Sequence, residues 1–130
     1  MDVLERLLAE RAIERMLVDY AALNDSGDWE SVAAMYLPEG RMSRPTAPDE
    51  FIEGHDAILA AFKARPARAS RHVAANIRVT IEGSSAAATS QILLFTAADK
   101  PPLVGTYADR LTQTADGWRF AERRGSLDFT

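Results

Sequence analysis

The chain has 130 residues, 47% of them hydrophobic and 26% charged, which is the size of one globular domain with a buried core and too short for two. Its 15 Lys and Arg against 19 Asp and Glu give a net charge of -4. The sequence shows no basic run or basic face interleaved with aromatic residues, so nucleic acid is not an expected partner. The absence of cysteine excludes disulfides, thiolate nucleophiles and Cys-ligated metals.

The first residues, Met1 to Arg6, lack the basic region and the continuous apolar run of a signal peptide. No stretch approaches the roughly 20 apolar residues that span a bilayer. We therefore expect a cytoplasmic protein that does not insert into membranes.

The first part of the chain predicts helices. From Val3 to about Asn24, apolar residues recur at helical spacing, which predicts a long helix with one face against a core. These residues are Leu4, Leu7, Leu8, Ile13, Met16, Leu17, Tyr20 and Leu23. Gly27 can end this helix, and Asp28 can cap a second one that continues to Pro38 and Gly40.

The segment from Arg41 to Phe51 contains Pro45 and Pro48 and few apolar residues, so it predicts a short strand that runs into a flexible loop. A third helix is predicted after Gly54, with apolar residues on one side until Pro66.

Beyond Ser70 the hydrophobic period changes to two, which predicts strands. In the strand over 72–81 this alternation puts His72 and Asn76 on the same face. A hairpin turn at 82–85 leads to a strand over 88–96, and strands over 103–114 and 118–127 flank a turn at Asp116-Gly117. Helices followed by an antiparallel meander predict a single α+β domain over residues 1–130, with helices covering one side of the sheet.

Asp25 and His72 are the candidate catalytic residues. An imidazole held by a carboxylate can take a proton from carbon or oxygen near neutral pH. Structural roles compete with this interpretation. Asp25 stands in a turn-forming context before Ser26 and Gly27, and a strand histidine is often satisfied by a backbone group in the core.

The remaining polar candidates favour structural roles. His55 follows Gly54 at a helix start and fits a surface or capping position. Two histidines without supporting spacing do not predict a zinc site, which usually needs three protein ligands. Trp118 and Phe120 are expected to pack in the core or at a dimer surface. Solvated sheet charges are expected at Asp109, Arg110, Arg123 and Arg124.

Five motifs in order carry a family resemblance. They are Tyr20-(x)4-Asp25-(x)2-Asp28-Trp29, Glu53-Gly54-His55-Asp56-Ala57-Ile58, Arg71-His72-(x)3-Asn76, Gly105-Thr106-Tyr107 and Asp116-Gly117-Trp118-Arg119-Phe120. Over nearly its whole length the chain resembles the SnoaL-like branch of the nuclear transport factor 2-like superfamily. The resemblance implies a cone-shaped, cystatin-like α+β roll, in which a curved antiparallel or mixed sheet wraps around three N-terminal helices and encloses an apolar pocket.

Within that superfamily the chain is most similar to scytalone dehydratases and hexachlorocyclohexane dehydrochlorinases, which perform eliminations with a His-Asp pair. The resemblance implies that Asp25 and His72 form this dyad, with no metal and no organic cofactor. Asn24 and Ser90 stand where scytalone dehydratases carry a tyrosine and a second histidine. The full set of expected substrate-binding residues is Tyr20, Asn24, Tyr36, Asn76, Ser90 and Tyr107.

We therefore expect a cofactor-independent lyase, of the dehydratase or dehydrohalogenase type, or an isomerase that acts on a small apolar cyclic or aromatic substrate. If the proton comes from carbon beside a carbonyl, a tyrosine hydroxyl among Tyr20, Tyr36 and Tyr107 can stabilise the enolate oxygen. The alternatives are a polyketide-cyclase-like or ketosteroid-isomerase-like enzyme with an aspartate base, and a non-catalytic small-molecule-binding or assembly domain. The resemblance also implies a homodimer or a higher homo-oligomer.

Overall fold

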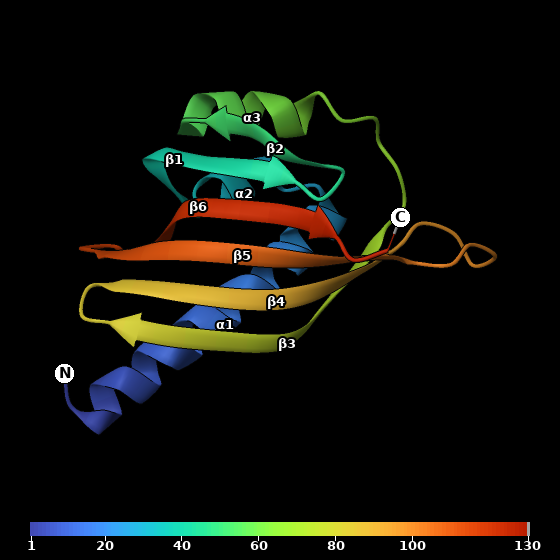
Figure 1. The fold of residues 1–130 in the computed structure, drawn as a ribbon. Coiled ribbons are helices and arrows are strands. Elements are labelled where there is room, and N and C mark those ends of the chain that lie inside the picture. The colour runs from blue at the N-terminus through green and yellow to red at the C-terminus, as the bar shows by residue number, and fades with distance from the viewer. Residues whose placement is uncertain (130) are drawn as a thin grey trace.

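The computed structural model describes residues 1–129 of the chain, which form three helices and one six-stranded sheet (Figure 1). The elements follow in the order α1 (Val3–Ser26), α2 (Trp29–Ala33), β1 (Tyr36–Arg44), β2 (Ala47–Glu53), α3 (His55–Lys63), β3 (Arg71–Glu82), β4 (Ser85–Phe95), β5 (Leu103–Thr114) and β6 (Gly117–Leu127).

The strand order in the sheet is β2-β1-β6-β5-β4-β3. Neighbouring strands are antiparallel except for β1 and β6, which run parallel. The helices gather on one face of this curved sheet, and α1 crosses behind β3, β4 and β5 (Figure 1). The predicted α+β architecture with a mixed sheet is confirmed.

Both ends of α1 are set by local sequence. At the start, the Asp2 carboxylate accepts the backbone N–H of Glu5 at 2.7 Å, and the Glu5 carboxylate accepts the N–H of Asp2 at 3.2 Å, which is a capping box. At the end, Gly27 adopts a left-handed φ of 72° and donates its N–H to the Asn24 carbonyl at 3.2 Å. The last turn of α1 therefore holds Asn24 and Asp25 at the end of the helix.

The predicted second helix is wrong in its length. α2 ends at Ala33, and Tyr36 already pairs with Phe120 in β6. Pro38 lies inside β1 rather than at a helix end, at an exposed position where the register between β1 and β6 shifts. At such an irregularity the missing N–H of proline removes no ladder hydrogen bond.

The flexible loop predicted after Arg41 is also wrong, because β1 and β2 form a hairpin that turns at Pro45 and Thr46. Contacts of Arg41 hold this hairpin together. Its guanidinium lies 4.0 Å above the Phe51 ring and 3.8 Å from the Glu53 carboxylate. These cross-strand contacts stabilise a pairing that the hydrophobic pattern does not reveal.

The core lies between the inner face of α1 and the concave face of the sheet. Fully buried side chains from every layer meet there: Ile13, Leu17, Val32, Ile58, Phe62, Leu111 and Phe120. Trp118 and Phe120 pack in this core.

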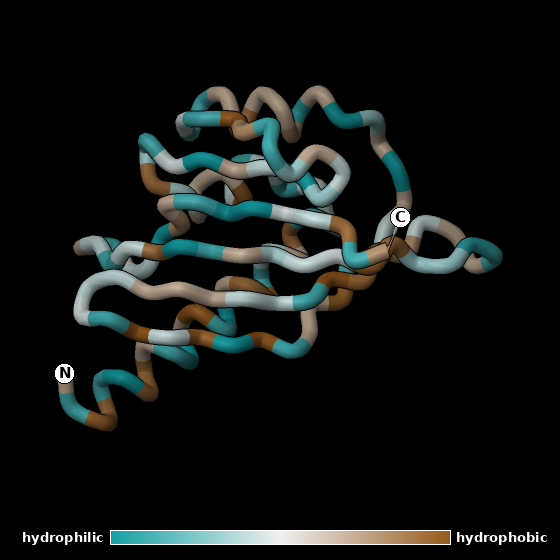
Figure 2. Tube along the Cα trace, viewed as in Figure 1, coloured by the Kyte–Doolittle hydropathy of each residue, from teal (hydrophilic) through white to brown (hydrophobic). Residues whose placement is uncertain are grey.

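The first two turns of α1 depart from the predicted stripe. Leu4, Leu7 and Leu8 are 65%, 55% and 61% exposed, because this end of the helix extends past β3 at the sheet edge (Figure 1). Figure 2 shows hydrophobic residues at this uncovered N-terminal end.

Candidate active site

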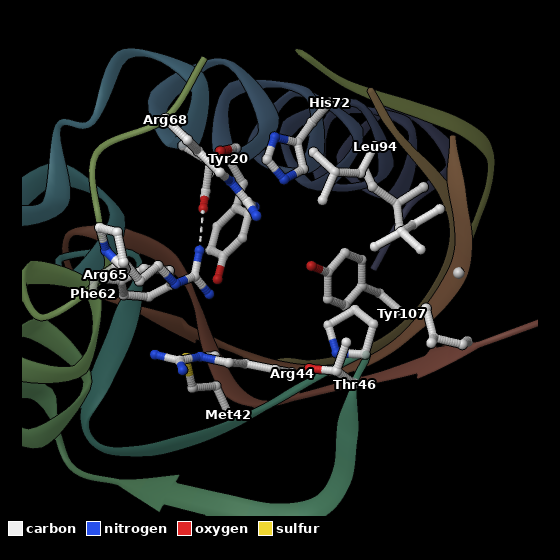
Figure 3. A pocket seen from close by; sticks show the side chains of 17 residues that line it. Tyr20, Met42, Arg44, Thr46, Phe62, Arg65, Arg68, His72, Leu94 and Tyr107 are labelled. Atoms are coloured by element: carbon white, nitrogen blue, oxygen red, sulfur yellow. Dashed lines mark hydrogen bonds between the residues drawn. The ribbon is translucent and has the colours of Figure 1, made fainter. Parts of the chain in front are cut away.

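A cavity of about 340 Å³ opens between the end of α1, the β1–β2 turn, α3 and the strands β3 to β6. One wall is apolar, with Ile92, Leu94, Leu103 and Leu127. Polar side chains on the remaining walls are Tyr20, Asn24, Arg44, Thr46, Arg65, Arg68, His72 and Tyr107 (Figure 3). The volume suits a ligand of one or two rings.

The structure brings Asp25 and His72 together, although 47 positions separate them in sequence. Asp25 comes from the last turn of α1 and His72 from the second residue of β3. His72 Nδ1 lies 2.6 Å from Asp25 Oδ1, and the backbone N–H of His72 donates to Oδ1 and Oδ2 at 3.0 and 2.9 Å. The Ser70 hydroxyl adds a third donor at 3.1 Å. Both side chains are largely buried, with exposures of 14% and 11%.

These contacts fix the charge of Asp25. Burial on its own raises the pKa of the Asp25 carboxyl, but the hydrogen bonds from the His72 ring, the His72 N–H and Ser70 outweigh it and hold that pKa below its usual value. An ionised carboxylate only accepts hydrogen bonds, so Nδ1 of His72 carries a proton. In the neutral ring, Nε2 then carries the lone pair; it makes no hydrogen bond within residues 1–129, and His72 lines the cavity.

The three candidate tyrosines differ in position. Tyr20 and Tyr107 line the cavity, whereas Tyr36 lies behind it, 3% exposed, with its hydroxyl 2.8 Å from that of Tyr20. Burial raises the pKa of Tyr20 to about 12, and it also raises the pKa of Tyr107, so both are neutral hydrogen-bond donors. Within residues 1–129 the Tyr107 hydroxyl makes no side-chain hydrogen bond, which leaves it available to a ligand.

Asn24 lines the cavity, donates from Nδ2 to the Tyr20 carbonyl at 3.0 Å, and accepts from Arg65 at 3.5 Å. Asn76 and Ser90 are not part of the lining. The register of β3 shifts between Ala75 and Arg78, and Asn76 sits in this irregularity with φ of 51° and an exposed side chain. The shift breaks the alternation that was expected to put Asn76 beside His72.

Behind the cavity lies an ion pair that the sequence did not predict. Asp109 and Arg123, expected as solvated charges, are 3% and 2% exposed, and Arg123 Nε lies 3.1 Å from Asp109 Oδ1. The Arg123 guanidinium lies 3.8 Å from the centre of the Tyr107 ring and 4.2 Å from that of Tyr20. Burial raises the pKa of Asp109 to about 6, although the charge of Arg123 acts in the opposite direction. The expectation was therefore wrong for this pair, whereas Arg110 is exposed and Arg124 pairs with exposed Asp49.

His55 lies away from this cavity, at the start of α3, with Nδ1 3.1 Å from the exposed carboxylate of Asp56. Over residues 1–129, no three His, Asp or Glu side chains come together in a way that could hold a metal ion. In the same part of the chain, no helix is long and apolar enough to cross a membrane.

The sequence matches the model of one protein family, the SnoaL-like domain, over residues 5–124. No curated protein matches the chain. In structure, 374 solved chains match.

Three of these structures share the fold over nearly the whole of this chain at 14% to 25% sequence identity. A nuclear transport factor 2-like protein with a cystatin-like fold from Novosphingobium aromaticivorans has a TM-score of 0.87 and 24% identity, over 98% of this chain and 87% of that one. A protein from the same organism, provisionally named a scytalone dehydratase, has a TM-score of 0.82 and 25% identity, over 95% and 87%. LinA has a TM-score of 0.86 at 14% identity, over 99% and 92%.

Proposed function

We propose a catalytic role for this cavity, on the premise that the chain belongs to the SnoaL-like domain family. The protein acts as a cofactor-independent lyase or isomerase on a small, mostly apolar cyclic or aromatic substrate. His72 is the general base and acid, and Asp25 is its orienting partner. The observation that carries the proposal is the 2.6 Å contact between His72 Nδ1 and Asp25 at the wall of a partly apolar cavity.

The first step is proton abstraction. Nε2 of His72 takes a proton from a substrate carbon beside a carbonyl, and the electron pair of that C–H bond moves toward the carbonyl oxygen. Asp25 stabilises the imidazolium that forms, because the carboxylate accepts its Nδ1–H. In a cavity with apolar walls this interaction is stronger than in water.

The enolate oxygen needs a donor, and the Tyr107 hydroxyl is the best placed of the tyrosines, since Tyr20 already pairs with Tyr36. Elimination is completed when the enolate expels a hydroxyl or halide from the next carbon and the imidazolium returns its proton to the leaving group. Isomerisation is completed when the proton returns to a different carbon. Either route leaves the protein unchanged without an external oxidant or reductant.

Two alternatives have less support. An aspartate base without histidine requires a carboxylate in the cavity, but Asp25 is engaged by His72 and no acidic residue of the described chain lines the 340 Å³ cavity. A binding or assembly role without chemistry needs no base at all, and the following experiment distinguishes it.

The test is hydrogen–deuterium exchange at the carbon beside the carbonyl of 2-tetralone in D₂O, followed by proton NMR. The expected result is exchange above the buffer rate with the wild type, reduced at least a hundredfold in His72→Asn and unchanged in the matched control His55→Asn. Equal rates in the wild type and His72→Asn would contradict the proposal. Binding of the ketone without exchange would indicate a binding domain instead.

Homodimer formation is a separate proposal. It is supported by the exposed apolar side chains Val73 and Phe95, which lie on the sheet face opposite the cavity near one end of β3 and β4. Sedimentation equilibrium at micromolar concentration tests it, with a monomer mass as the contradicting result.

A further inference from the structure

Three arginines enter the cavity on the side away from its apolar wall: Arg44 from the end of β1, and Arg65 and Arg68 from the segment after α3 (Figure 3). Within residues 1–129, none of them lies within 4.0 Å of a carboxylate, whereas Arg41 in β1 and Arg123 and Arg124 in β6 each do. The lining of this cavity includes no Asp or Glu from the described residues. Asp25 lines the adjoining hollow instead and is held by His72.

Two of these arginines are held in place by neutral contacts. Arg65 lies 4.4 Å above the Phe62 ring, which stacks on Trp29 with 5.3 Å between ring centres. Its Nη1 reaches only a long contact with Asn24, at 3.5 Å. Arg44 donates one Nη2 hydrogen bond to the Ala61 carbonyl at 3.0 Å, while its Nε is buried without a partner in the described residues. Most of the donors on both guanidinium groups therefore have no hydrogen-bond partner among the described residues.

The positive charges of Arg44 and Arg65 repel each other, which costs free energy. Burial, followed by the nearby charge of Arg44, lowers the pKa of Arg65. Arginine stays protonated in proteins even so, and a guanidinium taken partly out of water without a counterion is unfavourable. This applies to Arg44 and Arg65, which are half-buried, whereas Arg68 is exposed. A bound anion would offset the repulsion between the arginines and accept hydrogen bonds from their unpartnered donors.

We propose that the cavity takes an amphipathic carboxylate, whose carboxylate group is held by Arg44 and Arg65 near Arg68 and whose ring lies against Leu94, Leu103 and Tyr107. This inference rests on the proposed function and narrows its substrate class from apolar rings to ring acids. His72 lies between the arginines and Leu94 in Figure 3, so a ring that bridges the two walls passes the proposed base. The fork of a guanidinium matches the two oxygens of a carboxylate, which is why arginine suits this role better than lysine.

The test compares two probes of nearly equal shape, 2-naphthylacetate and 2-naphthylacetamide, by isothermal titration calorimetry at pH 7 and low salt. With the wild type, the acid should bind at least tenfold more tightly than the amide. Arg65→Gln and Arg44→Gln should each reduce that preference at least fivefold. The matched control is Arg78→Gln, at an exposed position of β3 outside the cavity lining, which should leave the preference unchanged. Thermal melting confirms that each variant folds.

Any of the following results would overturn the inference: equal affinity for acid and amide, no binding of the acid at millimolar concentration, or a full preference in the Arg44→Gln/Arg65→Gln double variant. Acetate that binds as tightly as 2-naphthylacetate would also overturn it, because the apolar wall would then contribute nothing.

The same titration with His72→Asn separates this inference from the catalytic proposal, since binding needs no base. A retained preference for the acid, together with no deuterium exchange by the wild type, would reject catalysis alone. Exchange by the wild type with equal affinity for the two probes would reject the carboxylate site alone.

Discussion

The carboxylate of Asp25 binds His72 at two places, the ring Nδ1 and the backbone N–H. The backbone contact ties the start of β3 to the last turn of α1, and the ring contact sets which nitrogen carries the proton. One side chain thus has a structural and a chemical role, and the two respond differently to substitution.

Asp25→Asn should separate them. An amide still offers one acceptor oxygen, so the fold should survive with a loss of about 1.5–3 kcal/mol in the free energy of unfolding, the range for hydrogen bonds to charged groups. The His72 ring should lose its single Nδ1-protonated tautomer, as reported by nitrogen-15 NMR of the ring nitrogens. His55 in the same spectrum serves as the internal control, because it does not contact Asp25. An unchanged His72 tautomer would show that the carboxylate does not set it.

The lowered pKa of Asp25 predicts a specific pH dependence of stability. In the unfolded chain the carboxyl titrates near 3.8, and in the folded protein it titrates lower. Its contribution to stability is therefore complete above the unfolded value and is lost as pH falls through the folded value. Urea unfolding of the wild type and Asp25→Asn should give a difference in stability that shrinks as the pH falls below about 4. A difference that grows on acidification below about pH 4 would contradict the lowered pKa of Asp25.

The buried pair of Asp109 and Arg123 predicts a strongly non-additive double-mutant cycle. Arg123→Met leaves the Asp109 carboxylate buried without a counterion and removes the cation above the Tyr107 ring, so it should cost about 3–5 kcal/mol in the free energy of unfolding. Asp109→Leu should be costly for the same reason.

The double variant Asp109→Leu/Arg123→Met should recover most of that loss, because it leaves neither buried charge without a counterion. The two groups lie 3.1 Å apart as an ion pair without hydrogen-bond geometry, so no hydrogen bond between them is lost. Urea denaturation of all four proteins measures the coupling. Additive effects of the two single variants would mean that the pair does not act as a unit.

Local sequence signals explain which parts of the fold were predictable. The capping residue Asp2 and the left-handed Gly27 set the bounds of α1, and the alternating pattern after Ser70 locates the antiparallel strands. The parallel pairing of β1 with β6 is a contact between distant segments that leaves no such pattern. Pro38, taken alone, argues against a strand at this position. The family resemblance, more than periodicity, linked Asp25 to His72.

The roles of Asp109, Arg123 and Arg65 at the site were not predicted from the sequence, for a different reason in each case. Asp109 has the same parity in β5 as Tyr107 and buried Leu111, so the alternation predicts that Asp109 is buried. Its charge favours the opposite expectation of a solvated side chain. Arg123 becomes buried because the register of β5 and β6 shifts between Arg110 and Leu111, which no local pattern reports. Arg65 lies outside the helices and strands, where periodicity carries no information.

Asn76 gives the sharpest test of a wrong expectation. It has φ of 51°, a conformation that asparagine tolerates and β-branched residues strongly avoid. Asn76→Val should therefore cost about 1–2 kcal/mol in the free energy of unfolding, while Asn76→Gly, which accepts positive φ, should be nearly neutral. Neither should change ligand affinity, since Asn76 does not line the cavity. Urea denaturation and titration with 2-naphthylacetate measure the two effects. A loss of affinity in Asn76→Gly at unchanged stability would return Asn76 to the binding site.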